Sequence, residues 1–294
     1  MLSICIPTYN YDVSVLVQTL VTQALGVSYP IEIQIRDDAS TQHLLSELRL
    51  PATSIPITTA HNTSNLGRTA TRALLAEDAQ YANLLFLDSD TLPKTPNFLE
   101  NFARYLNEDC DVIAGGIAYV ETAPEPSLRL RWLYGNKREA RPPEQRQKHP
   151  YLVVSGNLCI KKSLFQACNP KDQKGYGLDN IMALQLEQRQ AHVCHIDNPV
   201  YHLGLETNAV FLEKALAAID QLVAHEKSKP ELLQKTRLQL RYQQFKQWGL
   251  IPIIYGCLTL LRDRLKKRAL SDTPSLSAFD LIRLHHYIKS KRHG

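Results

Sequence analysis

The chain has 294 residues, enough to bury a sizeable core in one large domain or in one domain with an extension. Its 44% hydrophobic and 21% charged residues are those of an ordinary soluble globular protein. The net charge of +5 is uneven, because residues 228–294 hold 14 Lys and Arg against 4 Asp and Glu, whereas residues 1–227 hold 20 against 25.

The basic C-terminal tail, residues 228–294, indicates that this part of the chain meets an anionic partner. No nucleic-acid motif accompanies the charge, so we expect no nucleic acid. The longest apolar run, residues 249–261, contains Pro252 and is shorter than the ~20 residues of a spanning helix. The N-terminus lacks the basic segment of a signal peptide. We expect a cytoplasmic protein whose tail either contacts the anionic inner face of the plasma membrane or packs on the body or in an oligomer.

The six cysteines show neither a CxxC pair nor zinc-site spacing. Cys5, Cys159 and Cys194 lie in apolar, strand-like runs. They are predicted to be small, buried, free thiols in a reducing compartment.

From the N-terminus, short β-rich runs alternate with segments of helical spacing. We expect strands at residues 2–7, 31–35, 55–59 and 84–87, and helices at 13–25, 44–48 and 65–78. This alternation predicts an α/β fold with a mainly parallel sheet flanked by helices. Ligands of such sheets lie beyond the carboxyl ends of the strands, where Asp37 and Asp38 follow one strand and Asp88 and Asp90 another.

In the second half of the chain, the predicted elements include strands up to residue 205 and only helices after it. Before it, we expect strands at 112–120 and 151–160, a helix at 181–190, and a long polar connection at 121–150 that is functional or mobile. After it, helical spacing recurs at 211–223, 232–245, 255–265 and 279–288. The prediction is an α/β domain over residues 1–205 and a basic helical extension over 206–294.

Four motifs follow one another in the predicted domain. They are ICIPTYN at 4–10, IRDDAST at 35–41, LLFLDSD at 84–90 with NLGRTATR at 65–72 before it, and GYGLD at 175–179 with YHLG at 201–204 after it. Together they resemble the family 2 inverting glycosyltransferases, which have a GT-A-type fold. The resemblance covers residues 1–205. A lone DxD arises often by chance, but this one comes straight after a buried strand, with DDAS and PTYN upstream.

The resemblance implies a nucleotide-sugar donor, a divalent cation and transfer to a glycan or lipid-linked acceptor of the bacterial cell envelope. A hard cation that bridges a diphosphate needs oxygen ligands, and Asp88 and Asp90 can face the same side of an extended segment. By resemblance, Asp90 binds the metal, Asp88 reaches the ribose or a metal-bound water, and His202 completes the metal site. An imidazole ligand favours Mn²⁺ over Mg²⁺. The alternatives are a capping pair of aspartates and an ordinary strand-edge histidine.

The same resemblance implies the residues of the nucleotide pocket. Asp38 would accept a hydrogen bond from the uracil N3–H, which favours uridine or thymidine over cytidine. Tyr9 would stack on the base, although it could equally be a half-buried core residue, and Pro7 and Thr8 would line the base with backbone atoms. Arg72, four residues after Arg68 on one helix face, should reach the nucleotide.

Asp179 resembles the general base that takes the acceptor proton, although it could instead cap the following helix. Gly156 and Asn157 resemble the segment on the acceptor side. Leu178 stands where the family usually has an acid. Ala39 stands where glycine is common, which predicts no positive φ there.

Three alternatives concern the class of protein. Processive synthases carry a QxxRW motif, but this chain has Gln247 where that arginine belongs, so we expect a non-processive enzyme. A sugar-1-phosphate nucleotidyltransferase should show a Gly-rich, basic loop after the first strand, which PTYNYDVS is not. A non-catalytic nucleotide-sugar binder is favoured only by Leu178.

Overall fold

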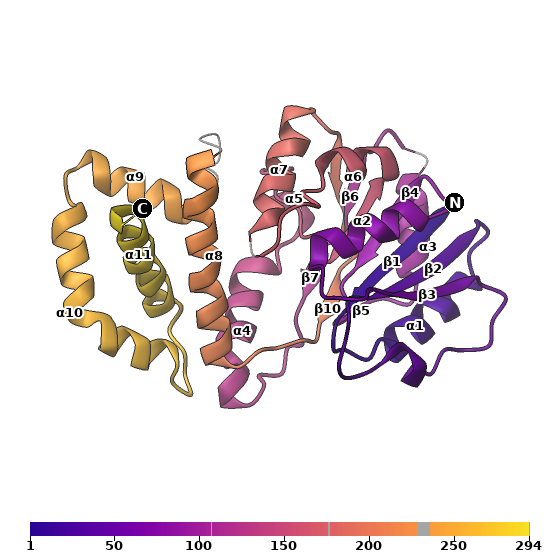
Figure 1. Ribbon diagram of the computed structural model, residues 1–294, viewed down its shortest axis with the longest axis horizontal. Coiled ribbons are helices and arrows are strands. Elements are labelled where there is room, and N and C mark those ends of the chain that lie inside the picture. Colours follow the sequence, from indigo (N-terminus) through magenta and orange to yellow (C-terminus); the bar gives the residue numbers. More distant parts are fainter. Residues whose placement is uncertain (107, 176, 229–235, 294) are drawn as a thin grey trace. The chain divides into compact units, whose positions relative to one another are not determined.

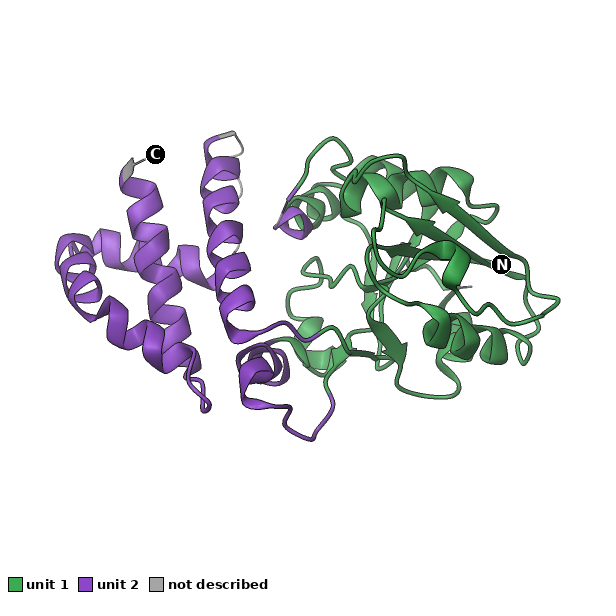
Figure 2. Cartoon of the chain, turned by 60° about the horizontal axis from the view of Figure 1, so that its bottom comes forward, with its two compact units in different colours: residues 1–119, 139–174, 181–204 green, residues 120–138, 175–180, 205–294 purple. Residues whose placement is uncertain are grey.

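The computed structural model describes residues 1–294 except 107, 176, 229–235 and 294. The chain divides into two compact units, shown in Figure 2. Unit 1 comprises residues 1–119, 139–174 and 181–204, and unit 2 comprises residues 120–138, 175–180 and 205–294. The sheets therefore belong to unit 1, and the long C-terminal helices belong to unit 2.

Unit 1 is built on a seven-stranded sheet with the order β3-β2-β1-β4-β8-β6-β9. Its strands are β1 (Leu2–Thr8), β2 (Ile31–Asp37), β3 (Ile57–His61), β4 (Asn83–Leu87), β6 (Val112–Ala114), β8 (Asn157–Lys161) and β9 (Val193–His195). Strand β8 runs antiparallel to both of its neighbours, while the other described pairings in this sheet are parallel. The predicted, mainly parallel α/β sheet is confirmed.

Helices cover both faces of this sheet (Figure 1). Helices α1 (Ser14–Ala24) and α3 (Phe98–Leu106) pack on one face, and α2 (Arg68–Asp78), α6 (Lys162–Cys168) and α7 (Leu178–Gln188) pack on the other. Alternate residues of β4 supply the two cores, because Leu85 and Leu87 face the first layer and Leu84 and Phe86 face the second. Helix α3 was not predicted, and the 3₁₀ turn η1 (Leu45–Glu47) is shorter than the helix expected there.

A second, three-stranded sheet has the order β5-β10-β7. It consists of β5 (Thr91–Pro93), β10 (Val200–His202) and β7 (Ile117–Ala118). The single strand predicted over 112–120 is wrong, because the chain leaves the large sheet at Gly115 and Gly116. Gly116 has a φ of +88°, and a Cβ on Gly115 would lie 2.5 Å from the Asn198 carbonyl oxygen, so glycines permit this bend.

The polar connection at 121–150 is folded into short helical segments. These are η2 (Pro126–Leu128), α4 (Arg129–Tyr134), the π-helical η3 (Gly135–Glu139) and α5 (Pro143–Arg146). Arg146, at the end of α5, fixes that helix to the large sheet. Its guanidinium donates to the carbonyls of Ala114 and Ile196 at 2.9 and 2.7 Å. The strand predicted over 151–160 is shorter than expected, since β8 begins at Asn157.

The C-terminal part of unit 2, after residue 204, is helical. Its helices are α8 (Asn208–Ser228), α9 (Arg237–Gln247), α10 (Ile251–Ala269) and α11 (Leu276–His293). All four predicted helices are present, although residues 232–235, where the second was expected to begin, lie outside the described residues. Within the described part of the chain, none of the helices combines the length and apolar character needed to cross a bilayer.

Glu226 joins three helices of unit 2. Its carboxylate is buried, and it accepts hydrogen bonds from Gln239 of α9 and from the Tyr287 hydroxyl of α11, at 2.5 and 2.7 Å. Lys291 of α11 adds an ion pair at 2.9 Å. Burial and the neighbouring Glu226 raise the pKa of Tyr287, so its hydroxyl remains a donor. This cluster neutralises one buried charge with groups from α9 and α11.

Candidate active site

The DSD segment forms the turn between β4 and β5. Asp88 donates its backbone N–H to the carbonyl of Gly156 at 3.2 Å. Its own carbonyl accepts from the backbone N–H and the hydroxyl of Thr91, at 3.1 and 2.7 Å. Hydrogen bonds to the backbone N–H and carbonyl of Asp88 therefore fix this turn.

Asp90 and His202 come together through the pairing of β5 with β10. Thr91 lies opposite His202 in that antiparallel pair, and Leu203 donates its N–H to the Asp90 carbonyl at 2.8 Å. The His202 Nε2 consequently lies 3.4 Å from Asp90 Oδ2. The ring also packs on Tyr119, with centroids 5.6 Å apart. Among the described residues, no hydrogen-bond partner faces the buried His202 Nδ1.

Asp88 contacts two arginines of α2. Arg72 is buried and donates from Nη2 to Asp88 Oδ1 at 2.5 Å and to the Ser155 carbonyl at 2.9 Å. The more exposed Arg68 lies 4.0 Å from Asp88 Oδ2. Burial disfavours the charged carboxylate, but the positive charges of Arg72 and Arg68 outweigh it and lower the pKa of Asp88. Asp88 is therefore an ionised carboxylate at neutral pH.

Two glycines leave room for the aspartate carboxylates. A Cβ on Gly156 would lie 2.5 Å from Asp88 Oδ2, and a Cβ on Gly204 would collide with Asp90 Oδ2. A carboxylate oxygen and an imidazole nitrogen at the Asp90–His202 pair are donors that suit a divalent cation such as Mn²⁺. The residues therefore fit the metal that the resemblance implies, with Asp88 held nearby by Arg72.

The turn after β1 is tied to the loop after β2. Asn10 has a φ of +51°, and its Oδ1 accepts the backbone N–H groups of Thr41 and Gln42 at 2.8 and 3.0 Å. Pro7 and Thr8 are buried, whereas the Tyr9 side chain is 50% exposed. Tyr9 thus presents a free aromatic face at the carboxyl end of β1.

The Asp38 carboxylate accepts three hydrogen bonds. Its Oδ1 accepts from Asn62 Nδ2 and from the Leu66 N–H, and its Oδ2 accepts from the Gly67 N–H, each at 2.8 Å. One lone-pair direction of Oδ2 remains for a further donor. Asp37 instead accepts the Ser40 N–H and hydroxyl, which confirms that it supports the loop.

Ala39, between these two hydrogen-bonded segments, contradicts our expectation. Its φ is +64°, so the position does adopt the left-handed conformation that glycine favours. The surrounding bonds of Asp37 and Asp38 impose this conformation on an alanine. Although position 39 holds alanine and not glycine, its φ is therefore positive.

The remaining predicted residues lie in different surroundings. Asp179 is half-buried in the first turn of α7 and belongs to unit 2, while Gly177 before that helix has a φ of +79°. Asn157 is buried, and its Nδ2 donates to the carbonyls of Gly116 and Asn198 at 2.7 and 2.9 Å. Asn157 thus holds the bend between the two sheets, and its predicted place on the acceptor side stays a prediction, as does that of Gly156.

Three residues of the candidate site were missed. Asn62, which supports Asp38, follows β3 directly and could have been found from its strand-end position. Tyr119 packs on His202, and Tyr11 lies close enough to Asp90 that burial and this charge raise the pKa of its phenol. No local sequence signal pointed to either tyrosine.

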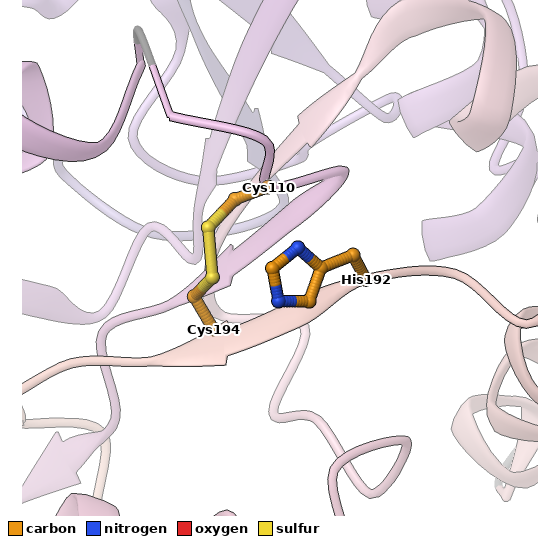
Figure 3. A group of neighbouring side chains, drawn as sticks. All are labelled: Cys110, His192 and Cys194. Carbon is orange, nitrogen blue, oxygen red and sulfur yellow. A yellow bond between two sulfur atoms is a disulfide. The ribbon is translucent and has the colours of Figure 1, made fainter.

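One cysteine prediction is wrong. Figure 3 shows Cys110 and Cys194 joined by a disulfide, with His192 beside them, and the two Cα atoms are 6.2 Å apart. Cys194 is therefore not a free thiol, and the disulfide occupies both sulfurs that could otherwise bind a metal with His192. Cys5 and Cys159 are buried and free as predicted. Burial raises the pKa of Cys159 to about 12, so it remains a protonated thiol.

Comparison with known proteins gives a family and a fold. The family model described as Glycosyl transferase family 2 matches residues 3–166. The chain is similar to the mannosyltransferase PcManGT from Pyrobaculum calidifontis, solved in complex with GDP-Man and Mn²⁺, at 14% identity and a TM-score of 0.59, over 99% of this chain and 86% of that one. It is also similar to S. aureus TarS 1–349 in complex with UDP-GlcNAc, at 16% identity and a TM-score of 0.49, over 99% and 90%. No curated protein matches the chain. The mannosyltransferase likeness confirms the GT-A-type fold.

Proposed function

Since the chain belongs to glycosyl transferase family 2 and is a glycosyltransferase, we propose that it moves one sugar per encounter from a UDP-sugar to a hydroxyl group, with inversion and with a divalent metal. The acceptor in this proposal is a glycan or a lipid-linked glycan. The observation that carries the proposal is the Asp90–His202 pair, 3.4 Å apart, which supports a metal bound beside the turn that follows the buried strand β4.

The residues in and around the aspartate segment have different proposed roles in binding the nucleotide diphosphate. Asp90 and His202 would hold Mn²⁺ or Mg²⁺, which when bound supplies positive charge opposite the departing diphosphate. Arg72 keeps Asp88 ionised and fixes its direction, so that this carboxylate can accept a ribose hydroxyl or a metal-bound water. In this arrangement, Arg72 supports nucleotide binding through Asp88.

The nucleotide end would be held by residues at the carboxyl ends of β1 and β2. The exposed ring of Tyr9 offers a stacking surface, and Pro7 and Thr8 form the wall beside it. The remaining acceptor direction of Asp38 Oδ2 suits the N3–H of uracil, while cytosine has no ring donor at that position. UDP should therefore bind more tightly than CDP.

Asp179 is our proposed general base. It would take the proton of the acceptor hydroxyl while that oxygen attacks the anomeric carbon opposite the leaving diphosphate. Gly156 and Asn157 are proposed to lie on the acceptor side. Leu178 is buried and apolar where the family usually has an acid, so Asp179 would act without a neighbouring carboxylate.

Calorimetry of UDP with and without Mn²⁺ tests the metal site. We expect binding to depend on Mn²⁺ in the parent protein and to lose that dependence in Asp90→Ala. Asp172→Ala, at an exposed aspartate, is the matched control and should bind as the parent does. Equal UDP affinity in Mn²⁺ and in EDTA would remove the metal from the proposal.

Turnover of Asp179→Asn tests the base. Transfer should fall by ~10²–10⁴ while UDP affinity stays close to that of the parent, because the substitution keeps the shape of the side chain. NMR of the new linkage should show the anomeric configuration opposite to that of the donor. A variant that transfers at the parent rate, or a retained configuration, would reassign Asp179.

We also propose that the basic tail contacts an anionic membrane. On α10, Ile253 and Leu260 are 63% and 86% exposed, and they precede the exposed cations Arg264, Lys267 and Arg268 on the same helix. Exposed apolar side chains beside cations suit the interface of a bilayer that contains anionic lipid. Co-sedimentation should be stronger with anionic than with neutral vesicles and should weaken in Leu260→Ser. Equal binding to both kinds of vesicle would contradict this proposal.

A further inference from the structure

Unit 2 contains a cavity of about 390 Å³ between α8, α10 and α11. Its apolar wall includes Leu212 and Leu216 of α8 and Ile282 of α11. This volume lies near the lower end of the ~300–1,000 Å³ of typical ligand pockets. The cavity belongs wholly to the helical unit and includes none of the residues assigned above to sugar transfer.

Cations surround this apolar wall. Arg262 and Lys266 of α10 and Lys289 of α11 line the cavity, and Glu213 is the acidic residue that lines it with them. These four side chains carry three positive charges and one negative charge, a balance of +2. Within the described ranges, no carboxylate lies within ion-pair distance of the three cations. Such a cluster favours an anionic ligand group.

The two histidines that line the cavity leave this charge balance unchanged. His285 stacks on Tyr255, with centroids 5.1 Å apart, and its Nε2 lies 3.0 Å from the Thr259 hydroxyl. Burial and the positive charges of Arg262, Lys289 and His286 lower the pKa of His285, so its ring is neutral at pH 7. His286 is 2.8 Å from Asp220, which offsets any charge on it.

We propose that the cavity binds a single-chain lipid with a phosphate headgroup. The alkyl chain would lie along Leu212, Leu216 and Ile282, and the phosphate would contact Arg262, Lys266 and Lys289. A phosphate monoester carries about −1.5 to −2 charges at pH 7, which matches the balance of the lining better than a carboxylate does. The volume accommodates one chain. The lining does not include Ile253 or Leu260, so the site is distinct from the exposed α10 face proposed to meet a bilayer.

Calorimetry of the full chain with dodecyl phosphate, below its micellar concentration, tests the site. We expect one molecule to bind per chain, with affinity at least ~100-fold above that for inorganic phosphate, because burial of the chain contributes most of the free energy. Dodecyltrimethylammonium, with the same chain and the opposite charge, should not bind. Comparable affinity for inorganic phosphate would replace the lipid site with a free-anion site, and binding of the cationic probe would remove the role of the cations.

Two double variants, one on α10 and one on α9, separate the cavity from general surface charge. Arg262→Gln with Lys266→Gln should weaken dodecyl phosphate binding by ~10-fold or more, the worth of a hydrogen bond to a charged group. Arg241→Gln with Lys246→Gln removes the same charge from exposed positions of α9 outside the cavity and should leave that affinity unchanged. Equal losses in both double variants would overturn the proposal. UDP binding is measured independently, so failure here would leave the proposed sugar transfer untouched.

Discussion

Replacement of Arg72 by methionine should destabilise the protein far more than loss of an ordinary surface ion pair. The Arg72 side chain is 5% exposed, Asp88 is 26% exposed, and their nearest atoms are 2.5 Å apart. Methionine preserves much of the volume of the stem but leaves the Asp88 carboxylate with one arginine, Arg68, 4.0 Å away. The free energy of unfolding should therefore fall.

The size of this effect follows from the burial of the pair. Removal of one partner from a fully buried ion pair costs ~3–5 kcal/mol. Because a quarter of Asp88 reaches solvent and Arg68 remains, we expect the lower end, about 3 kcal/mol. At ~2–4 °C per kcal/mol for a unit of this size, the melting temperature should fall by roughly 6–12 °C.

The pH dependence has a definite sign. The folded-state pKa of Asp88 is lowered, so its stabilising contribution is fully present above the unfolded value of ~3.9 and disappears as the pH falls through the folded pKa. The cost of Arg72→Met should thus be complete at pH 7 and should shrink in acid, where Asp88 is protonated.

Thermal unfolding of Arg72→Met, Asp88→Asn and the double variant measures the coupling between the two residues. Asp78→Asn is the matched control, since Arg36 and Asp78 are also 2.5 Å apart but Asp78 is 58% exposed. That variant should lose less than ~1 kcal/mol. The reasoning would be refuted if Arg72→Met cost no more than Asp78→Asn, or if the double variant showed no coupling.

Two further predictions concern backbone strain and thiols. Ala39→Gly should raise the free energy of unfolding by about 1 kcal/mol in urea titrations because Ala39 has a φ of +64°, whereas Ala217→Gly, at an exposed position inside helix α8, should lower it by about 1 kcal/mol. A loss of stability in Ala39→Gly would contradict the strain. Maleimide should label the exposed Cys257 in the native protein and four cysteines after unfolding without reductant, because Cys110 and Cys194 are joined. Mass spectrometry counts the labels, and six labels without reductant would disprove the disulfide.

The sequence was sufficient for features set by local pattern. The apolar runs that became β1, β2 and β4 identified the parallel sheet, and the polar residues at their ends placed Asp38 and Asp88 at one edge. The same rule would have found Asn62 after β3. Local periodicity also identified the helices after residue 205, because each buries an apolar stripe.

Contacts between residues that are distant in the sequence could not be predicted from local sequence pattern. Asp90 meets His202 only because β5 pairs with β10, and helical spacing alone could not decide which of Arg68 and Arg72 would be buried against Asp88. The disulfide joins cysteines 84 residues apart. Ala39 shows a different limit, because hydrogen bonds on both sides outweigh the modest cost of a left-handed alanine.

The three-helix contact at Glu226 has a consequence for the timing of folding during protein synthesis. This glutamate is made 61 residues before Tyr287 and 65 before Lys291, which together satisfy its carboxylate. A buried carboxylate without its partners is strongly unfavourable. Helix α8 therefore cannot complete its native packing on the ribosome until α11 has left the exit tunnel. Unit 1 faces no such delay, since its last residue, Gly204, emerges first, so the sheet can form while the helical unit is still being translated.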